Sequence, residues 1–218
     1  MVNWDSICQE ETMSDKQIPD IIVARLPQYL RSLQRMAREG EKITSSQELG
    51  ERLGLSAAQI RKDLSQFGEF GKQGTGYFIP YLIDQLQKIL HVDHDWDAVV
   101  VGAGDIGSAL VNYKGFANRG FKVKLVFDND PAKIGTKIGD FIIQDYAHMV
   151  ESIRQHDIKI AMIAVPIGSA QEVADRLMEA GVKAILIYAP IIINHPESVR
   201  VQYIDPSMHL QRMTFYLG

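Results

Sequence analysis

The chain has 218 residues, of which 46% are hydrophobic and 23% charged, and its formal net charge is −4. These values are ordinary for a globular protein of one or two domains. No apolar run is long enough to span a membrane, the N-terminus lacks a signal-peptide pattern, and Cys8 is the only cysteine. We therefore expect a cytoplasmic protein without internal disulfides or a metal site.

The charges are unevenly distributed along the chain. Residues 1–17 hold four acids and one Lys without apolar periodicity, so we expect a mobile tail. Residues 18–92 carry ten Lys and Arg against eight Asp and Glu, whereas residues 93–218 carry twelve against fifteen. A slightly basic segment between acidic ones is a weak indication of a nucleic-acid surface.

The segment 18–92 predicts a small helical domain with one hairpin. Helices are expected from Pro19 to about Arg38 and from Tyr81 to about Leu90, with two short helices between them. Ser45, followed by Glu48, fits a capping box for the first short helix, and Ser56 can cap the second. The glycine-rich stretch GEFGKQGTGYFI then fits a hairpin. Helix, turn, helix and hairpin in this order are typical of a winged helix.

Several side chains of this domain are candidates for contacts to DNA. On the second short helix Ile60, Leu64 and Phe67 form the apolar side. The polar candidates that leave this side, together with the hairpin tip, are Arg61, Lys62, Ser65 and Lys72. The alternative is a three-helix protein-interaction module with a solvated basic face.

The segment 93–204 alternates strand and helix patterns, as in a doubly wound parallel sheet. Strands are expected at 97–102, 122–127, 158–165 and 183–188, with a shorter strand at 138–143. Helices are expected at 106–118, 145–155 and 169–180. Near-continuous apolar runs such as IKIAMIAV indicate strands that are buried on both faces.

The first strand of this domain leads into a glycine-rich turn. Gly102, Gly104 and Gly107 permit a tight turn and a close approach of the backbone to a pyrophosphate. Asp128 lies 21 residues beyond Gly107 and ends the next strand, where a carboxylate binds a ribose diol. The pairs Val165–Pro166 and Ala189–Pro190 end two other strands and belong to the same ligand-binding edge. The alternatives are a glycine turn without a ligand and prolines that only end strands.

The remaining sequence bears on catalysis and assembly. The six His are scattered, and no HExxH, GxSxG or paired-carboxylate pattern occurs. Fewer than thirty residues follow Pro190, too few for a separate substrate domain. Residues 205–218 predict a C-terminal helix whose apolar side chains dock either on a second subunit or on its own domain.

Five stretches together resemble the family of redox-sensing transcriptional repressors called Rex. They are ARLPQYLRSL, AAQIRKDLSQFGEFGK, VGAGDIGSALVNYKGF, FDNDPAKIG and AQEVADRLMEAGVKAIL, and the resemblance runs from about residue 18 to 217. It implies a winged-helix domain, a Rossmann-like domain that binds NADH or NAD⁺, and a C-terminal helix swapped into the partner of a homodimer. It further implies binding to palindromic operator DNA and release when NADH rises.

The resemblance also implies roles for individual residues. Gly102, Ala103, Gly104, Asp105, Ile106 and Gly107 would hold the pyrophosphate, and Asp128 the adenosine ribose. Arg61, Lys62 and Ser65 would face DNA. Arg31, Tyr113 and Asp205 would form a network that links the domains and changes partners with the cofactor state, and Tyr113 and Asp205 would also contact the cofactor.

Three positions depart from the family pattern. Asp105 stands where Asn or Arg is frequent, and an acid beside a pyrophosphate weakens binding unless its side chain points away. Gln73 replaces a commonly basic residue, which predicts a shallower salt dependence of DNA binding through Lys72. Pro206 follows Asp205 where an aromatic or aliphatic residue is usual, which would alter packing against the nicotinamide.

Two other functions remain open from the sequence. One is a small NAD-dependent dehydrogenase, and the other is a regulator that responds to a different nucleotide such as coenzyme A. Asp128 argues against a preference for NADP(H), because a 2′-phosphate would meet a carboxylate.

Overall fold

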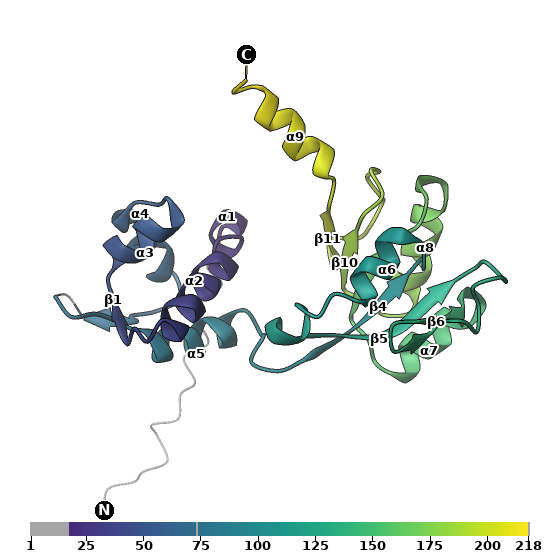
Figure 1. Cartoon of the computed structure of the whole chain (residues 1–218), viewed down its shortest axis with the longest axis horizontal. Coiled ribbons are helices and arrows are strands. Elements are labelled where there is room, and N and C mark those ends of the chain that lie inside the picture. Colours follow the sequence, from purple (N-terminus) through teal and green to yellow (C-terminus); the bar gives the residue numbers. More distant parts are fainter. Residues whose placement is uncertain (1–17, 73, 218) are drawn as a thin grey trace, which may run out of the picture. The chain divides into compact units, whose positions relative to one another are not determined.

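The computed structural model describes residues 18–72 and 74–217, with only the backbone of Lys72. The expected tail, residues 1–17, and the departure at Gln73 therefore lie outside the described residues. The chain divides into two compact units, with the boundary between Asp93 and His94. Figure 1 shows the helices and strands of both units.

The first unit is a helical domain with a small antiparallel sheet. Its strands β1 (Ile43–Thr44), β3 (Gly76–Phe78) and β2 (Gly71–Lys72) pair in the order β1-β3-β2. The helices are α1 (Asp20–Val23), α2 (Leu26–Arg38), α3 (Ser46–Leu53), α4 (Ala57–Leu64) and α5 (Ile79–Ile89). The expected helix-turn-helix corresponds to α3 and α4, and the β2–β3 hairpin is the wing.

One core holds these helices together. The apolar residues of α2 that follow helical spacing are buried, and so are those on the inner sides of α3, α4 and α5. The fully or almost fully buried members are Leu26, Tyr29, Leu33, Met36, Leu49, Ile60, Leu64, Ile79, Leu82 and Leu86. Because α2 contributes most of its apolar side to this core, its position is fixed relative to α4.

The prediction of one helix from Pro19 to Arg38 was wrong. The chain forms α1 and α2, separated at Ala24 and Arg25. Pro27 occupies the second position of α2, and it cannot donate the backbone hydrogen bond that a continuous helix would need there. The break therefore follows from Pro27.

The second unit is built on a six-stranded parallel sheet with the order β11-β10-β9-β4-β5-β8. Its strands are β4 (Trp96–Val101), β5 (Phe121–Asp128), β8 (Gln144–Asp145), β9 (Ile160–Ile163), β10 (Ala184–Ile187) and β11 (Arg200–Tyr203). The strand sequence reverses between β4 and β9, and ligands of such sheets bind at the carboxyl ends beside this reversal. The doubly wound prediction is confirmed.

Helices cover both faces of the sheet. Ala98 and Val100 of β4 pack with α6 (Asp105–Val111) on one face. Val99 and Val101 pack on the other face with α7 (Met149–Gln155) and α8 (Ile167–Glu179). Successive residues of one strand are thus buried on opposite faces, which explains the unbroken apolar run in the sequence.

The boundaries of several elements differ from prediction. The helix expected at 106–118 ends at Val111, and the chain continues through a short 3₁₀ helix, η1 (Ala117–Arg119), which ends at Gly120 with a φ of 81°. The helix expected at 145–155 begins at Met149, after the 3₁₀ helix η2 (Tyr146–His148). The strand expected at 138–143 is a hairpin of β6 (Lys137–Ile138) and β7 (Phe141–Ile142).

The chain ends in helix α9 (Pro206–Thr214), which follows β11 and extends away from the sheet in Figure 1. None of its residues is buried. Its exposed apolar side chains and those of the residues after it are Met208, Leu210, Met213, Phe215, Tyr216 and Leu217. The C-terminal helix is confirmed as an element, and it does not dock on its own unit.

Candidate functional site

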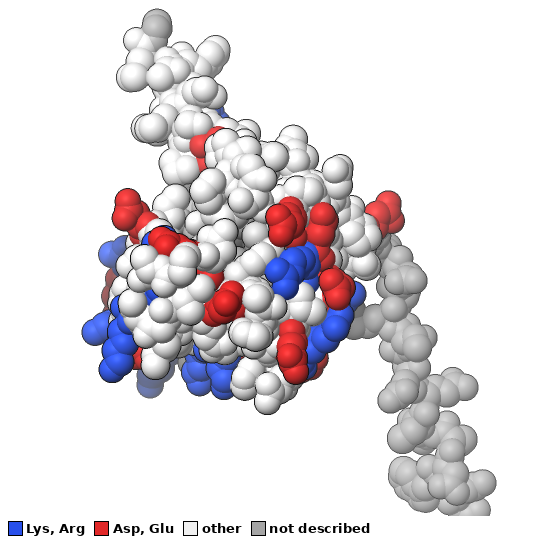
Figure 2. All heavy atoms as spheres, turned by 90° about the vertical axis from the view of Figure 1, so that its right-hand side faces the viewer, with Lys and Arg blue, Asp and Glu red and all other residues white. Residues whose placement is uncertain are grey.

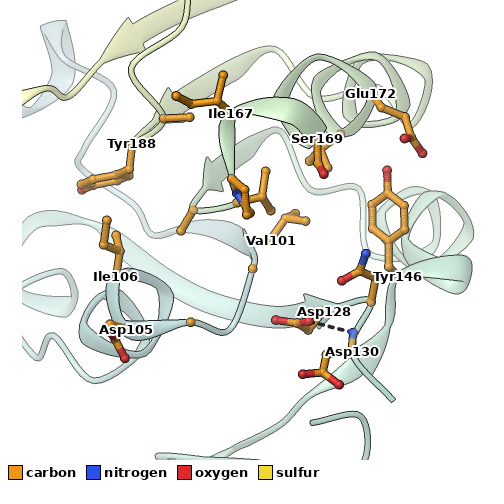
Figure 3. A pocket seen from close by; sticks show the side chains of 18 of the residues that line it. Val101, Asp105, Ile106, Asp128, Asp130, Tyr146, Ile167, Ser169, Glu172 and Tyr188 are labelled. Atoms are coloured by element: carbon orange, nitrogen blue, oxygen red, sulfur yellow. Dashed lines mark hydrogen bonds between the residues drawn. The ribbon is translucent and has the colours of Figure 1, made fainter. Parts of the chain in front are cut away.

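A pocket of about 690 Å³ opens at the carboxyl ends of the parallel strands. Its wall includes the last residues of β4 and β5, Val101 and Asp128, and the residues that directly follow β9 and β10, Ala164 and Tyr188. Figure 3 shows Tyr188, Ile106 and Ile167 at one end of the pocket and Tyr146, Glu172 and Asp130 at the other. The pocket has a size typical of cofactor sites and lies where the strand order reverses.

The glycine turn forms one wall, and its glycines are required by sterics. Gly102 has a φ of 97°, and a Cβ there would lie 2.4 Å from the carbonyl oxygen of Ala164. A Cβ on Gly107 would lie 1.8 Å from the carbonyl oxygen of Gly102. Gly104 precedes α6 without a side-chain cap and is open to the pocket. The turn therefore exposes backbone to a ligand, as a pyrophosphate site requires.

Asp128 belongs to the pocket wall, with its side chain 7% exposed. Its Oδ2 accepts a hydrogen bond from the amide of Ala103 at 2.7 Å, and its Oδ1 accepts one from the amide of Asp130 at 2.9 Å. The ammonium of Lys133 lies 3.3 Å from Oδ2. Burial acts to raise the pKa of Asp128, but these three contacts outweigh it and lower the pKa below its usual value. The group is an ionised acceptor suited to a diol.

The Asp105 carboxylate points away from the interior of the pocket in Figure 3, although the residue belongs to the pocket wall. The side chain is exposed at the start of α6. This orientation keeps the negative charge away from the interior of the pocket, and an acid in the first turn of a helix is also favourable for the helix dipole.

The far end of the pocket contains a tyrosine with an unused hydroxyl. The Tyr146 hydroxyl is buried and makes no hydrogen bond to any described residue. The guanidinium of Arg176 lies 4.3 Å from the centre of the ring, and its Nη2 donates to the carbonyl of Ala147 at 3.2 Å. Burial is the largest contribution that raises the pKa of Tyr146, so the hydroxyl keeps its proton at neutral pH.

Nine of the expected cofactor residues lie on the pocket wall. They are Gly102, Gly104, Asp105, Ile106, Asp128, Val165, Pro166, Ala189 and Pro190. Ala103 and Gly107 do not line the pocket. The Ala103 amide donates a hydrogen bond to Asp128, and Gly107 packs closely against the carbonyl of Gly102.

Tyr113 and Asp205 are not part of the pocket wall. The Tyr113 hydroxyl accepts a hydrogen bond from Arg119 Nη1 at 3.0 Å. Asp205 caps α9 by accepting from the amide and hydroxyl of Ser207. Both side chains thus have local partners within their own unit, and Arg31 is exposed on α2.

Several pocket residues did not emerge from the sequence. Tyr188 directly precedes Ala189–Pro190, so its place at a strand end was a usable signal. Asn129, Asp130 and Lys133 lie on the connection after β5, whose path no periodicity fixes, and Tyr146 begins η2. Ile167, Ser169, Glu172 and Val173 lie in the first two turns of α8.

Three of the four candidate DNA-binding residues are exposed on α4 or at its C-terminal end. Arg61 and Lys62 are exposed on the helix, and Ser65 follows at its C-cap, where its hydroxyl donates to the carbonyl of Lys62 at 2.9 Å. Arg61 Nη1 donates to Ser46 Oγ at 2.9 Å. Lys72 belongs to β2 of the wing hairpin, and its side chain lies outside the described residues.

The predicted serine caps begin both helices of the helix-turn-helix. The Ser45 and Ser56 hydroxyls accept from the amides of Glu48 and Gln59, each at 3.1 Å. Gly54 ends α3 in the left-handed region with a φ of 69°. The Glu48 carboxylate accepts from the Thr44 hydroxyl at 2.9 Å instead of reaching back to Ser45, so the capping box is only half formed.

A buried ion pair attaches α4 to the start of α2. Asp63 is fully buried, and its carboxylate accepts from Arg25 Nε and Nη2 at 2.6 and 2.8 Å. It also accepts from the Tyr29 hydroxyl and from Gln59 Nε2, both at 2.5 Å. Burial acts to raise the pKa of Asp63, but these hydrogen bonds prevail and lower it.

Across residues 18–72 and 74–217, no group of three or more His, Cys, Asp and Glu side chains could hold a metal ion. In that part of the chain no helix has the length and apolar character needed to cross a membrane. Figure 2 shows acidic and basic side chains intermingled on one face of the molecule.

Comparison with known proteins gives matches to both units. Residues 17–65 match a family described as a putative DNA-binding protein N-terminus, and residues 93–191 match a family described as a CoA binding domain. A redox-sensing transcriptional repressor Rex from Chloroflexus aurantiacus is 54% identical over 200 residues, which cover 92% of this chain and 94% of that protein. The Rex protein of Streptomyces coelicolor is 41% identical, covering 91% of this chain and 77% of that protein.

Solved structures agree with these matches. A structure of RSP in complex with β-NAD⁺ and operator DNA has a TM-score of 0.88 at 37% identity and covers 92% of each chain. RSP, described as a Rex-family repressor, in complex with β-NADH has a TM-score of 0.84 at 35% identity and covers 92% of this chain and 94% of that chain. On the strength of these relatives, which span nearly its whole length, the chain belongs to the family of redox-sensing transcriptional repressors called Rex.

Proposed function

We propose that the chain is a redox-sensing transcriptional repressor that binds palindromic operator DNA as a homodimer and leaves it when NADH binds. The observation that carries this proposal is the presence, on one chain, of a winged helix with an exposed polar face and a dinucleotide pocket with an ionised ribose-binding carboxylate. The relatives with operator DNA, NAD⁺ and NADH in their names support the same combination.

The winged helix would read DNA through α4. Arg61, Lys62 and Ser65 would contact base edges and phosphates in a major groove, and Lys72 would contact the backbone from the wing. In a dimer, the two α4 helices would have to lie about 34 Å apart, or a multiple of this, to enter successive major grooves. A small rotation between subunits would abolish this match.

The pocket would bind the cofactor along its length. Gly102 to Gly107 would hold the pyrophosphate, Asp128 the adenosine ribose, and the end near Ile106, Tyr188 and Pro190 the nicotinamide. NAD⁺ and NADH differ by one positive charge on that ring, so groups near it interact differently with the two forms. Moving the dimer from mostly bound to mostly released requires roughly 5.5 kcal/mol of differential binding, shared over two sites.

The switch would act through Arg31, Tyr113 and Asp205. Tyr113 and Asp205 would exchange their local partners, Arg119 and Ser207, for new ones when the reduced cofactor enters. The exposed apolar residues of α9 support a dimer in which this helix is swapped onto the partner subunit.

A DNA-binding titration tests the proposal. Fluorescence anisotropy with palindromic DNA would be measured with NAD⁺ and with NADH at matched saturation. We expect NADH to weaken operator binding at least tenfold relative to NAD⁺. Equal release by both cofactors would contradict the proposal.

Coenzyme A is a second candidate ligand, because residues 93–191 match a CoA binding family. Calorimetric titration with NADH and with coenzyme A separates the two, and we expect NADH to bind at least tenfold more tightly. Tighter binding of coenzyme A would indicate that coenzyme A, and not NADH, is the effector.

The proposal assigns the chain no catalytic role and places it in the cytoplasm, where operator DNA and the nicotinamide pool meet. The relatives named above are repressors. Steady nicotinamide absorbance during incubation of NADH with carbonyl compounds is the expected result, and turnover would contradict it.

A further inference from the structure

Lys133 faces the carboxylate that the proposed function assigns to the adenosine ribose. Its Nζ lies 3.3 Å from Oδ2 of Asp128 and 4.0 Å from Oδ2 of Asp130. Its side chain is 39% exposed and belongs to the pocket wall. Of the described residues that line the pocket, Lys133 is the only Lys or Arg. The single cation of the pocket is thus placed at the ribose position.

The backbone holds Lys133 in this position. The Asp130 carbonyl accepts from the Lys133 amide at 2.9 Å, and the Asp130 side chain accepts from the Ala132 amide at 2.9 Å. Asp130 itself donates its amide to Asp128 at 2.9 Å. These hydrogen bonds close a turn immediately after β5 that returns the Lys133 side chain to the end of the strand.

The chemistry of the ribose gives this contact a consequence. In NADH both ribose hydroxyls can donate to Asp128. In NADPH the 2′-oxygen carries a phosphate of roughly −1.5 to −2 charge, so one donor is lost and two anions come together. The Lys133 ammonium lies 3.3 Å from Oδ2 of Asp128. It would attract the 2′-phosphate, which the Asp128 carboxylate repels.

We propose that Lys133 is a specificity-determining residue of the dinucleotide pocket, whose ammonium offsets the repulsion between Asp128 and a ribose 2′-phosphate. The chain therefore discriminates against NADPH less strongly than it would if Asp128 were present without Lys133. The inference rests on the proposed function, because it assumes that a nicotinamide dinucleotide occupies the pocket in this direction.

The test compares the ratio of the dissociation constants for NADPH and NADH. Lys133→Met removes the charge at similar size, and Lys137→Met removes an exposed charge on β6, outside the pocket wall. We expect Lys133→Met to raise the ratio about five- to tenfold and Lys137→Met to leave it within about twofold, because the interaction is close to the pocket and partly screened. Calorimetry provides both constants, with NADPH measured by competition where it binds weakly.

An Asp128→Asn background sharpens the test. There the ratio should fall about tenfold or more, and Lys133→Met should raise it by a larger factor than in the native chain, because the ammonium no longer faces a full carboxylate charge. Adenosine 2′-phosphate, compared with adenosine 5′-phosphate as a competitor of NADH, should lose affinity selectively in Lys133→Met.

The outcomes separate the two proposals. Equal loss of NADH and NADPH affinity in Lys133→Met, as expected if the ammonium contacts the pyrophosphate, would overturn the role in specificity while leaving the proposed function intact. An unchanged ratio would do the same. Failure of the native chain to bind NADH would overturn both.

Discussion

Two tyrosines with buried hydroxyls differ in a way that predicts different results for the same substitution. The Tyr29 hydroxyl donates to the Asp63 carboxylate at 2.5 Å, whereas the Tyr146 hydroxyl has no hydrogen-bond partner among the described residues. Tyr29→Phe should lower the free energy of unfolding by about 1–3 kcal/mol, because it removes a hydrogen bond to a charged group. Tyr146→Phe should not lower it, since only an unsatisfied hydroxyl is removed.

Urea unfolding of the free protein measures both effects. A loss of more than about 1 kcal/mol in Tyr146→Phe would mean that this hydroxyl has a partner in solution. The same variant, titrated with NADH, also shows whether the hydroxyl bonds to the cofactor when the pocket is filled.

Asp63 predicts a dependence of stability on pH. Because its pKa is lower in the folded chain than in the unfolded chain, its contribution is complete above the unfolded value of about 4 and is lost as the pH falls through the folded value. Asp63→Asn should cost about 3 kcal/mol near neutral pH, since Arg25 loses its partner. Its thermal unfolding temperature should fall less steeply than that of the native chain between about pH 5 and pH 3.

Calorimetry at several pH values measures this difference. Asp84→Asn is a suitable control, because Asp84 pairs with Lys88 on the surface of α5, where both side chains are more than half exposed. Parallel pH profiles for the native chain and Asp63→Asn would contradict the assignment.

Helix α4 is the element on which the proposed DNA reading depends. Arg61→Ala should weaken operator binding about tenfold or more, because a guanidinium in the groove contributes about 1–3 kcal/mol of discrimination. Arg38→Ala, which removes an exposed charge from α2, should change affinity by less than about threefold. Anisotropy on operator and on scrambled DNA measures both, and unchanged affinity in Arg61→Ala would remove this residue from the reading helix.

The elements with strong local signals could be predicted from the sequence. Ser45, Ser56 and Gly54 mark the ends of α3 and α4, and the apolar runs of β4 and β5 mark strands buried on both faces. The break before α2 was missed even though Pro27 signals it. Strand β11 was missed because its residues alternate between exposed and half-buried and form no apolar run.

The candidate site divides in the same way. The glycine turn and Asp128 have fixed spacing along the chain, so the sequence located them. Lys133 reaches the pocket from the irregular connection after β5, Tyr146 from the start of η2, and Glu172 from α8. Their positions depend on how these segments pack, which local sequence does not encode.

At the scale of the whole molecule, the uncovered apolar side of α9 predicts the state of assembly. Leu210→Asp together with Met213→Asp should yield monomers and abolish cooperative binding to a palindrome, because a charge on each residue opposes burial in a dimer. Sedimentation velocity measures the mass in solution. Gln211→Asp, a polar replacement on the same helix, is the control. A dimer that persists in the double variant would contradict a role for α9 in assembly.

The salt bridge that joins α4 to the residue before α2 has a mechanical consequence. The hydrogen bonds from Arg25 and Tyr29 to Asp63 connect α2 rigidly to α4. A displacement of α2 would therefore move α4 with it as one rigid body, without bending inside the domain. Arg31 lies on α2, six residues beyond Arg25, so a new contact made by Arg31 would displace α4 together with α2.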